Sequence, residues 1–274
     1  MKQWYYILLC SVLLAACARQ QSSVELTILH TNDTHSQVEP RQDNTGGYAR
    51  RMGLISQERQ KDPELILLDA GDFCQGTPYY NYLGGEVEIA AMNRMGYDAA
   101  TIGNHEFDNG VNALAEQLKR TEFDVVCANY RIEKSPLEGI VKPYTILNRK
   151  GLKIGVTGVD VNPEALVTED NFSPLAYESP FEAANKIAKM LKKEKHCDVV
   201  ICLSHLGTDV SHGDTTGVCD VNLAAQSRDI DLIIGGHTHR AENRYVKNRD
   251  DKDVLLVQTG KSGVRLGKVT LIVE

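Results

Sequence analysis

Five short apolar runs in the sequence each end in residues that can bind metal ions. In chain order these residues are Asp33 with His35, Asp72, Asn104 with His105, His205, and His237 with His239. Carboxylate, amide and imidazole donors together suit divalent ions such as Zn²⁺, Mn²⁺ or Fe²⁺. Sites in open α/β sheets form beyond the carboxyl ends of the strands, so we expect these side chains to converge. The residue types and their order therefore predict a metal centre.

Each of these motifs is weak when it stands alone. Asp33 and His35 could belong to a surface turn, Gly-Asp is common in turns, and His237 and His239 could lie in a solvated loop. The whole set, however, contains five of the eight histidines. In extended backbone, residues two apart project to one side, so each Asp/His or His/His pair would grip one ion or straddle two. Neighbouring glycines permit tight turns close to the ions: Gly71, Gly103, Gly235 and Gly236.

Around these residues, apolar runs typical of strands alternate with stretches whose apolar residues recur at helical spacing. Apolar, β-branched runs predict strands at 25–31, 65–69, 98–102, 123–128, 153–159, 197–204, 230–235, 253–259 and 267–273. Amphipathic stretches predict helices at 47–60, 85–95, 110–120, 181–194 and 221–227. Strands that alternate with helices are typical of the α/β class.

The composition indicates a globular protein and argues against one class of partner, nucleic-acid duplexes. The chain has 274 residues, 42% of them hydrophobic, which is typical of a globular protein and not of a disordered or coiled-coil chain. The formal net charge is −7, and no basic stripe is visible, which argues against a nucleic-acid duplex as partner. An acidic protein that binds phosphate must supply positive charge locally, and metal ions would do so.

The N-terminal residues predict a targeting segment. Residues 1–16 contain Lys2 and then an apolar run too short to span a bilayer, and they end in small residues before Cys17. This resembles a bacterial lipoprotein signal. It implies a lipid anchor at Cys17, a tether at 17–24 and a catalytic domain at 25–274, held at the periplasm-facing membrane or the cell surface. The alternative is an ordinary secretory signal in which the cysteine is accidental.

The ordered motifs resemble the calcineurin-like metallophosphoesterases. Longer runs are similar to the catalytic domain of the bacterial 5′-nucleotidases and UDP-sugar hydrolases; these runs are 29–35, 69–78, 103–108 and 258–267. The similarity extends over about residues 25–273. It implies a four-layer α/β/β/α sandwich of two mixed β-sheets flanked by helices.

The resemblance also implies roles for individual residues. One divalent ion, whether Mn, Zn, Fe, Mg or Ca, would be held by Asp33, His35, Asp72 and His239. The second would be held by Asp72, Asn104, His205 and His237, so that Asp72 bridges the two ions. His105 would face the phosphoryl group together with Asn104 and would be oriented by Asp108.

The implied reaction is release of phosphate from phosphomonoesters, with 5′-nucleotides as the expected substrates. A hydroxide that bridges the two ions would attack in line, and His105 would stabilise the transition state or protonate the leaving oxygen. Three alternatives stay open for the bond: a nucleotide-sugar pyrophosphate, a cyclic nucleotide or a sulfur ester. The similar enzymes carry a second, C-terminal substrate domain, so a separate polypeptide could supply it, and the chain could be inactive until it binds that partner.

Overall fold

The computed structural model describes residues 23–210 and 216–274, which form two six-stranded sheets and a small two-stranded one. In spatial order, the first sheet holds β14 (Gly267–Val273), β1 (Val24–Thr31), β2 (Ile66–Asp69), β3 (Ala99–Ala100), β4 (Asp124–Val126) and β6 (Val141–Lys142). The second holds β12 (Ala241–Lys247), β13 (Asp253–Thr259), β11 (Leu232–Gly235), β10 (Val199–His205), β8 (Leu152–Asp160) and β7 (Tyr144–Arg149). β5 (Tyr130–Arg131) pairs with β9 (Ala176–Tyr177).

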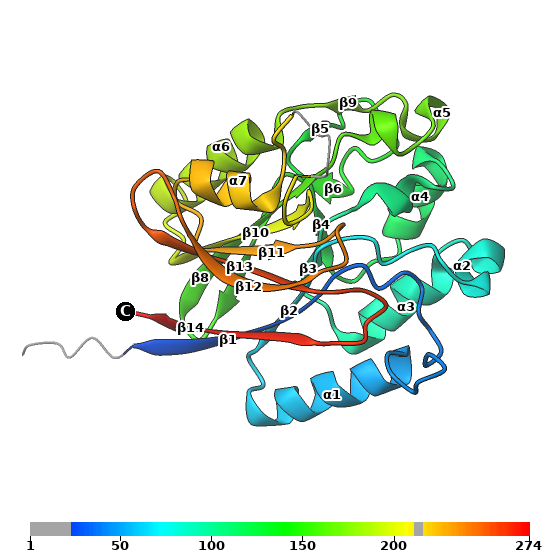
Figure 1. Ribbon diagram of the computed structural model, residues 1–274, viewed down its shortest axis with the longest axis horizontal. Helices are drawn as coiled ribbons and strands as arrows, with labels where there is room; N and C mark the ends of the chain where they lie inside the picture. The colour runs from blue at the N-terminus through cyan, green and yellow to red at the C-terminus, as the bar shows by residue number, and fades with distance from the viewer. Residues whose placement is uncertain (1–22, 211–215) are drawn as a thin grey trace, which may run out of the picture.

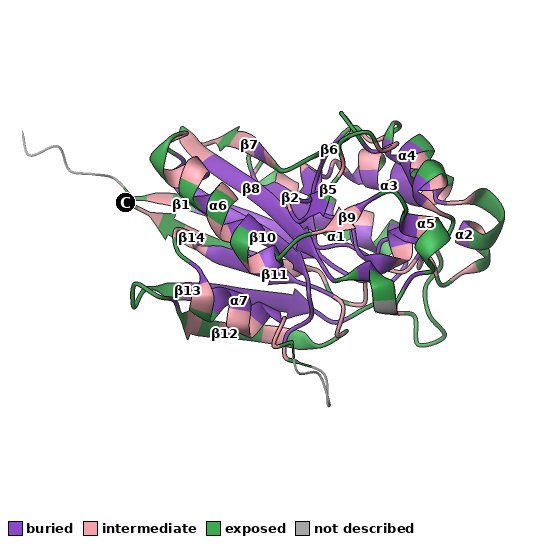
Figure 2. Ribbon diagram, turned by 90° about the horizontal axis from the view of Figure 1, so that it is seen from above, coloured by how far each residue is buried: buried purple, intermediate pink, exposed green. Residues whose placement is uncertain are grey.

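The two large sheets pack against each other, and helices cover their outer faces (Figures 1 and 2). Between the sheets lies an apolar cluster that includes Ile28 of β1 and Leu203 of β10. α6 (Pro180–Lys193) and α7 (Asp220–Gln226) cover the second sheet, and α1 (Tyr48–Lys61), α3 (Glu86–Met95) and α4 (Val111–Leu118) cover the first. This confirms the predicted α/β/β/α sandwich.

The pattern of β1 shows why its sequence forms a buried strand. Leu26 and Ile28 face the second sheet, whereas Leu29 faces the cluster beneath the helices. A strand covered on both faces needs apolar residues at successive positions, and β1 has them. β1 begins at Val24, which the sequence analysis placed in the tether. Residues 1–22, with the predicted signal and Cys17, lie outside the described residues.

Parallel pairing brings the site loops to one edge. β1, β2 and β3 run parallel to one another in the first sheet, and β8, β10, β11 and β13 do so in the second. The segments that follow β1, β2, β3, β10 and β11 therefore emerge on the same side of the sandwich. They carry the predicted ligands.

Several elements of the structure have hydrophobic patterns too weak to predict them from the sequence. They are the short strands β5, β6 and β9, the edge strands β7 and β12, the helices α2 (Pro78–Leu83) and α5 (Glu169–Phe172), and the 3₁₀ turns η1 (Asn104–Phe107) and η2 (Pro163–Ala165). No position in β12 is buried, because this strand lies at the edge of its sheet. An edge strand needs no continuous apolar run, and its polar sequence gave no strand prediction. No helix in the described part of the chain is long and apolar enough to cross a bilayer.

Candidate metal centre

The predicted ligands form two clusters at the carboxyl edge of the sandwich. Asp33, His35 and His239 make the first cluster, and Asp72, His205 and His237 make the second. Within each cluster the three candidate ligand atoms lie within 4.8 Å of one another. Each cluster takes residues from both large sheets, so neither sheet alone could assemble either cluster.

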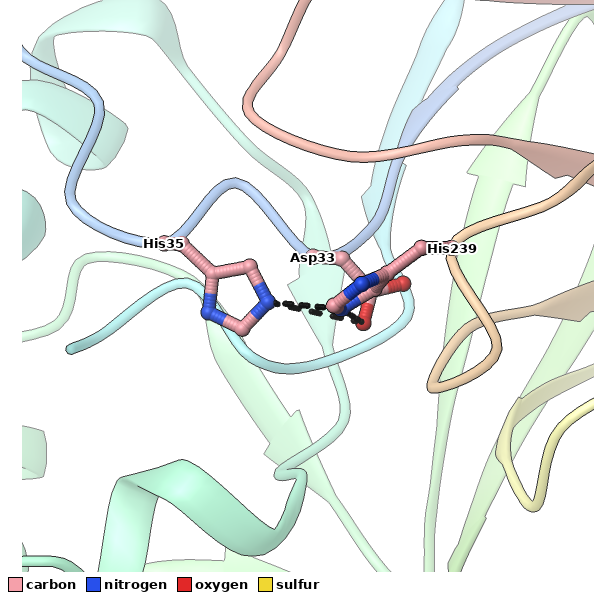
Figure 3. A group of neighbouring side chains, drawn as sticks. All are labelled: Asp33, His35 and His239. Carbon is pink, nitrogen blue, oxygen red and sulfur yellow. Dashed lines mark hydrogen bonds and ion pairs between the residues drawn. The ribbon is translucent and has the colours of Figure 1, made fainter. Parts of the chain in front are cut away.

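The three side chains of the first cluster point toward a common centre (Figure 3). The Nε2 atoms of His35 and His239 are 2.9 Å apart, and the His239 Nε2 atom is 3.3 Å from Asp33 Oδ1. Two imidazole nitrogens and a carboxylate oxygen that converge in this way fit a shared cation. Asp33 is fully buried, whereas about a third of the His239 side chain is exposed. The cluster is therefore open to solvent on the His239 side.

The second cluster contains a buried nitrogen that has no hydrogen-bond partner. The Nδ1 atom of His205 donates to the carbonyl oxygen of Ala70 at 2.7 Å. Its other nitrogen, Nε2, lies 3.0 Å from Asp72 Oδ2 but makes no hydrogen bond. A histidine held by a carbonyl at one nitrogen, with the other free, is the usual arrangement of a metal-binding imidazole. The donors at this position thus fit a divalent ion.

Asn104 and the local charges complete the second cluster. The Asn104 Oδ1 atom lies 3.0 Å from His237 Nδ1, within reach of the same centre. Burial alone would lower the pKa of His205, but the carboxylates of Asp72 and Asp33 raise it well above its ordinary value. The two carboxylates therefore create a strongly negative field, which a pair of cations would neutralise.

Five of the candidate ligands sit on left-handed backbone rather than on extended backbone. The φ angles are 49° at Asp33, 44° at His35, 55° at Asp72, 71° at His237 and 57° at His239. The expectation of extended backbone at these pairs is therefore wrong. Of the two arrangements that the sequence left open, Asp33 and His35 lie in one cluster, whereas His237 and His239 lie in different clusters. A non-glycine residue with positive φ costs free energy, and such residues concentrate at functional sites.

Two glycines leave room for ligands, as the sequence indicated. A Cβ atom added at Gly103 would lie 2.3 Å from Asp72 Oδ1. One added at Gly236 would lie 2.7 Å from His205 Nδ1. Any side chain at either position would displace a candidate ligand, so close packing rather than turn geometry alone requires glycine there.

His105 and Asp108 lie beside the clusters and outside them. His105 Nδ1 is 3.0 Å from Asp108 Oδ2, and about a third of each side chain is exposed. The hydrogen bond to Asp108 raises the pKa of His105 above its ordinary value, although partial burial opposes it. The imidazole packs edge-on against His35, with ring centroids 5.5 Å apart. This arrangement places an oriented imidazole next to the first cluster.

Glu106 is a site residue to which sequence analysis gave no role. Its buried carboxylate accepts the backbone N–H groups of Asp72 and Cys74 at 2.9 Å and that of Gly103 at 2.6 Å. It therefore holds two ligand-bearing loops together. Burial, and then the charge of Asp72, raise the pKa of Glu106 to about 8. No local pattern in the sequence could reveal a role that depends on a loop more than thirty residues away.

Asn32 was missed for the same reason. Its Nδ2 atom donates to Asp33 Oδ2 at 2.6 Å and to the carbonyl oxygen of Gly260 at 2.7 Å. Its Oδ1 atom accepts from the backbone of Thr259 at 2.9 Å. Asn32 thus orients one ligand and fixes it to the end of β13.

Comparison with known proteins agrees with this geometry. The chain is 33% identical over 288 residues to the snake venom 5′-nucleotidase of Gloydius brevicauda, which covers 95% of this chain and 47% of that protein. The 5′-nucleotidase precursor of Thermus thermophilus superposes with a TM-score of 0.79 at 30% identity, over 91% of this chain and 55% of its own. The NAD nucleotidase of Haemophilus influenzae superposes with a TM-score of 0.80 at 26% identity, over 92% and 55%.

The chain thus spans about half the length of the relatives it matches. The family model described as calcineurin-like phosphoesterase matches residues 26–241. The resemblance drawn from the sequence motifs is confirmed. Because the family match covers most of the chain and the two Asp/His clusters fall within it, this protein belongs to the calcineurin-like phosphoesterase family.

Proposed function

We propose that this chain is a phosphohydrolase that releases phosphate from phosphomonoesters, with 5′-nucleotides as its substrates. The observation that carries the proposal is the pair of Asp/His clusters next to the His105–Asp108 pair. The similarity to 5′-nucleotidases from a snake and a bacterium supports the choice of substrate.

Two divalent ions in these clusters would polarise the phosphoryl oxygens and lower the pKa of an attacking water. Side chains of the protein itself would bind the phosphoryl group and transfer the proton. Asn104, which is buried, and His105, which is partly exposed, would contact the phosphoryl group. His105, kept cationic by Asp108, would stabilise the charge that develops in line with the attack and give its proton to the leaving oxygen.

The proposal is tested by measuring how fast the protein, produced as the chain that starts just after Cys17, releases phosphate from added esters. The protein is purified without chelator, supplied with Mn²⁺ and offered 5′-AMP beside a simple aryl phosphate. Release from 5′-AMP is the expected result. No release from either ester, with two metal ions bound per chain, would contradict the proposal. Nucleotide-sugar, cyclic-nucleotide and sulfur-ester substrates, offered next, would then test the alternatives.

We also propose that the protein is a lipoprotein anchored through Cys17 and located outside the cytoplasm. The small residues before Cys17 and the short apolar run support this. Mass spectrometry of the N-terminal peptide from the native host should find a lipid on Cys17, and Cys17→Ser should release the protein from the membrane fraction. A separate polypeptide that supplies a substrate domain stays a prediction.

A further inference from the structure

A cavity separate from the metal centre opens where the edges of the two large sheets face each other. Its volume is about 360 Å³, a size typical of sites for small molecules. β14 is an edge strand of the first sheet and β12 is an edge strand of the second, and residues of both strands line the cavity (Figure 1). None of the candidate metal ligands lines it. The function proposed above therefore assigns this cavity no role.

The floor of the cavity contains a buried histidine with an unpartnered ring nitrogen. His30 belongs to β1, is 2% exposed and lines the cavity. Its Nδ1 atom has no hydrogen-bond partner. Burial lowers the pKa of His30 to about 4, so the imidazole is neutral near pH 7 and presents one donor and one acceptor. A buried polar atom without a partner costs free energy, and a ligand hydroxyl in the cavity would supply that partner.

The space beside this imidazole depends on Gly267, which also lines the cavity. Gly267 is the residue of β14 that pairs with His30, and a Cβ atom added there would lie 2.1 Å from His30 Nε2. The φ angle of Gly267 is not in the left-handed region, so backbone conformation does not require glycine here. The missing side chain therefore leaves one side of the ring uncovered.

The rim of the cavity carries an arginine that has no acidic partner. The other charged residues in the lining are already paired. Glu242 accepts from Arg244 Nη2 at 2.6 Å, and Lys268 Nζ donates to Glu58 at 2.6 Å. Arg265 is exposed, and no ion pair in the described part of the chain involves it. Its guanidinium group is therefore available to a carboxylate, which arginine binds through two parallel hydrogen bonds.

The wall of the cavity is apolar close to both of these groups. Three of its residues are less than a tenth exposed: Leu255, Val257 and Val269. Arg265 precedes Gly267 by two residues, at most about 7 Å of extended chain, and Gly267 pairs with His30. A short hydrocarbon skeleton is thus long enough to place one polar end at the arginine and the other at the imidazole.

We propose that this cavity binds a small organic acid that also carries a hydroxyl group. The carboxylate of the ligand would pair with Arg265, its skeleton would lie against the apolar wall, and its hydroxyl would form a hydrogen bond with His30. The site does not depend on the reaction proposed for the metal centre. 4-Hydroxybenzoate has all three features and is the probe for the tests.

The first test is calorimetry of the full, Mn²⁺-loaded chain with 4-hydroxybenzoate and two analogues. Benzoate, which lacks the hydroxyl, should bind about fivefold more weakly. 4-Hydroxybenzyl alcohol, which lacks the carboxylate, should bind about tenfold more weakly or worse. Equal affinities for 4-hydroxybenzoate and benzoate, or no binding of 4-hydroxybenzoate, would overturn the inference.

The second test uses substitutions at the two polar ends of the site. Arg265→Gln should weaken the binding of 4-hydroxybenzoate about tenfold or more. Arg50→Gln is the matched control, because Arg50 is an exposed arginine on α1 that does not line the cavity. His30→Phe should abolish the preference for 4-hydroxybenzoate over benzoate. This variant keeps an aromatic ring and removes the unpartnered nitrogen, so its Tm should not fall below that of the unaltered protein.

A carboxylate also binds metal ions, so 4-hydroxybenzoate is tested as an inhibitor of phosphate release as well. Competitive inhibition, together with unchanged binding in Arg265→Gln, would place the acid on the ions and overturn the inference. Equal weakening by Arg265→Gln and Arg50→Gln would also overturn it, because the acid would then respond only to the overall charge of the protein.

Discussion

At the scale of single residues, the site separates side chains that hold ions from side chains that act on the substrate. Asp33, Asp72 and His205 are buried and point into the clusters. His105 and Asp108 stay partly exposed, bonded to each other. This division predicts which substitutions will remove metal ions and which will only slow the reaction.

His105→Asn should slow turnover by about 10²–10⁴, the range typical of a lost general acid. Metal content should not change, because His105 belongs to neither cluster. The measurements are kcat and the number of metal ions per chain by mass spectrometry. Loss of metal in this variant would contradict the assigned role.

Asp220 should make the stability of the metal-free protein depend on pH. Burial raises the pKa of this carboxyl to about 8, and its Oδ2 atom has no hydrogen-bond partner. Between about pH 4 and pH 8 the unfolded chain has lost this proton while the folded chain keeps it, so stability falls as pH rises. Asp220→Asn has no carboxyl group to titrate, so it should not show this decrease in stability as pH rises.

The measurement is urea unfolding of the protein and of Asp220→Asn, in chelator, at about pH 5 and pH 8. The variant should become more stable relative to the unaltered protein at the higher pH. Parallel pH profiles would show that Asp220 does not titrate in this way.

At the scale of elements, short loops after parallel strands determine the ligand geometry. The loop after β2 and the turn η1 approach so closely that Gly103 has no room for a Cβ atom. Glu106, also in η1, fixes the same contact through backbone N–H groups. The position of Asp72 therefore depends on packing between loops.

Gly103→Ala should displace Asp72 and lower the metal content per chain together with activity. Gly53→Ala is the matched control, because nothing lies within 4 Å of an added Cβ atom in the middle of α1. That variant should gain up to about 1 kcal/mol of stability and keep its metal. Metal analysis and thermal unfolding of both variants provide the comparison. Full metal occupancy in Gly103→Ala would contradict the packing argument.

At the scale of the whole molecule, the metal centre joins the two sheets. Asp33, Asp72 and Asn104 lie in segments that follow strands of the first sheet, whereas His205 ends β10 and His237 and His239 follow β11 of the second sheet. The backbone N–H of His237 also donates to the Asp33 carboxylate at 3.0 Å. Ions bound here would therefore stabilise the packing of one sheet on the other.

Removing metal with a chelator should lower Tm, and Mn²⁺ should restore it in a saturable way, because an ion that binds only the folded state stabilises it. The increase should be smaller in His205→Asn. His196→Asn is the control, because His196 is an exposed histidine outside both clusters. If Mn²⁺ raised Tm equally in all three proteins, the result would contradict the prediction that an ion held by His205 stabilises the packing of the two sheets.

The sequence by itself determined the buried strands, the main covering helices and the types and order of the ligands. It could do so because burial on both faces leaves apolar runs, and metal chemistry restricts the residues that follow them. The tertiary structure alone decided that the paired ligands lie on left-handed backbone and that Glu106 and Asn32 support the ligand loops. It also revealed the edge strands β7 and β12. These features depend on contacts between segments far apart in the chain, and local hydrophobic periodicity carries no information about such contacts.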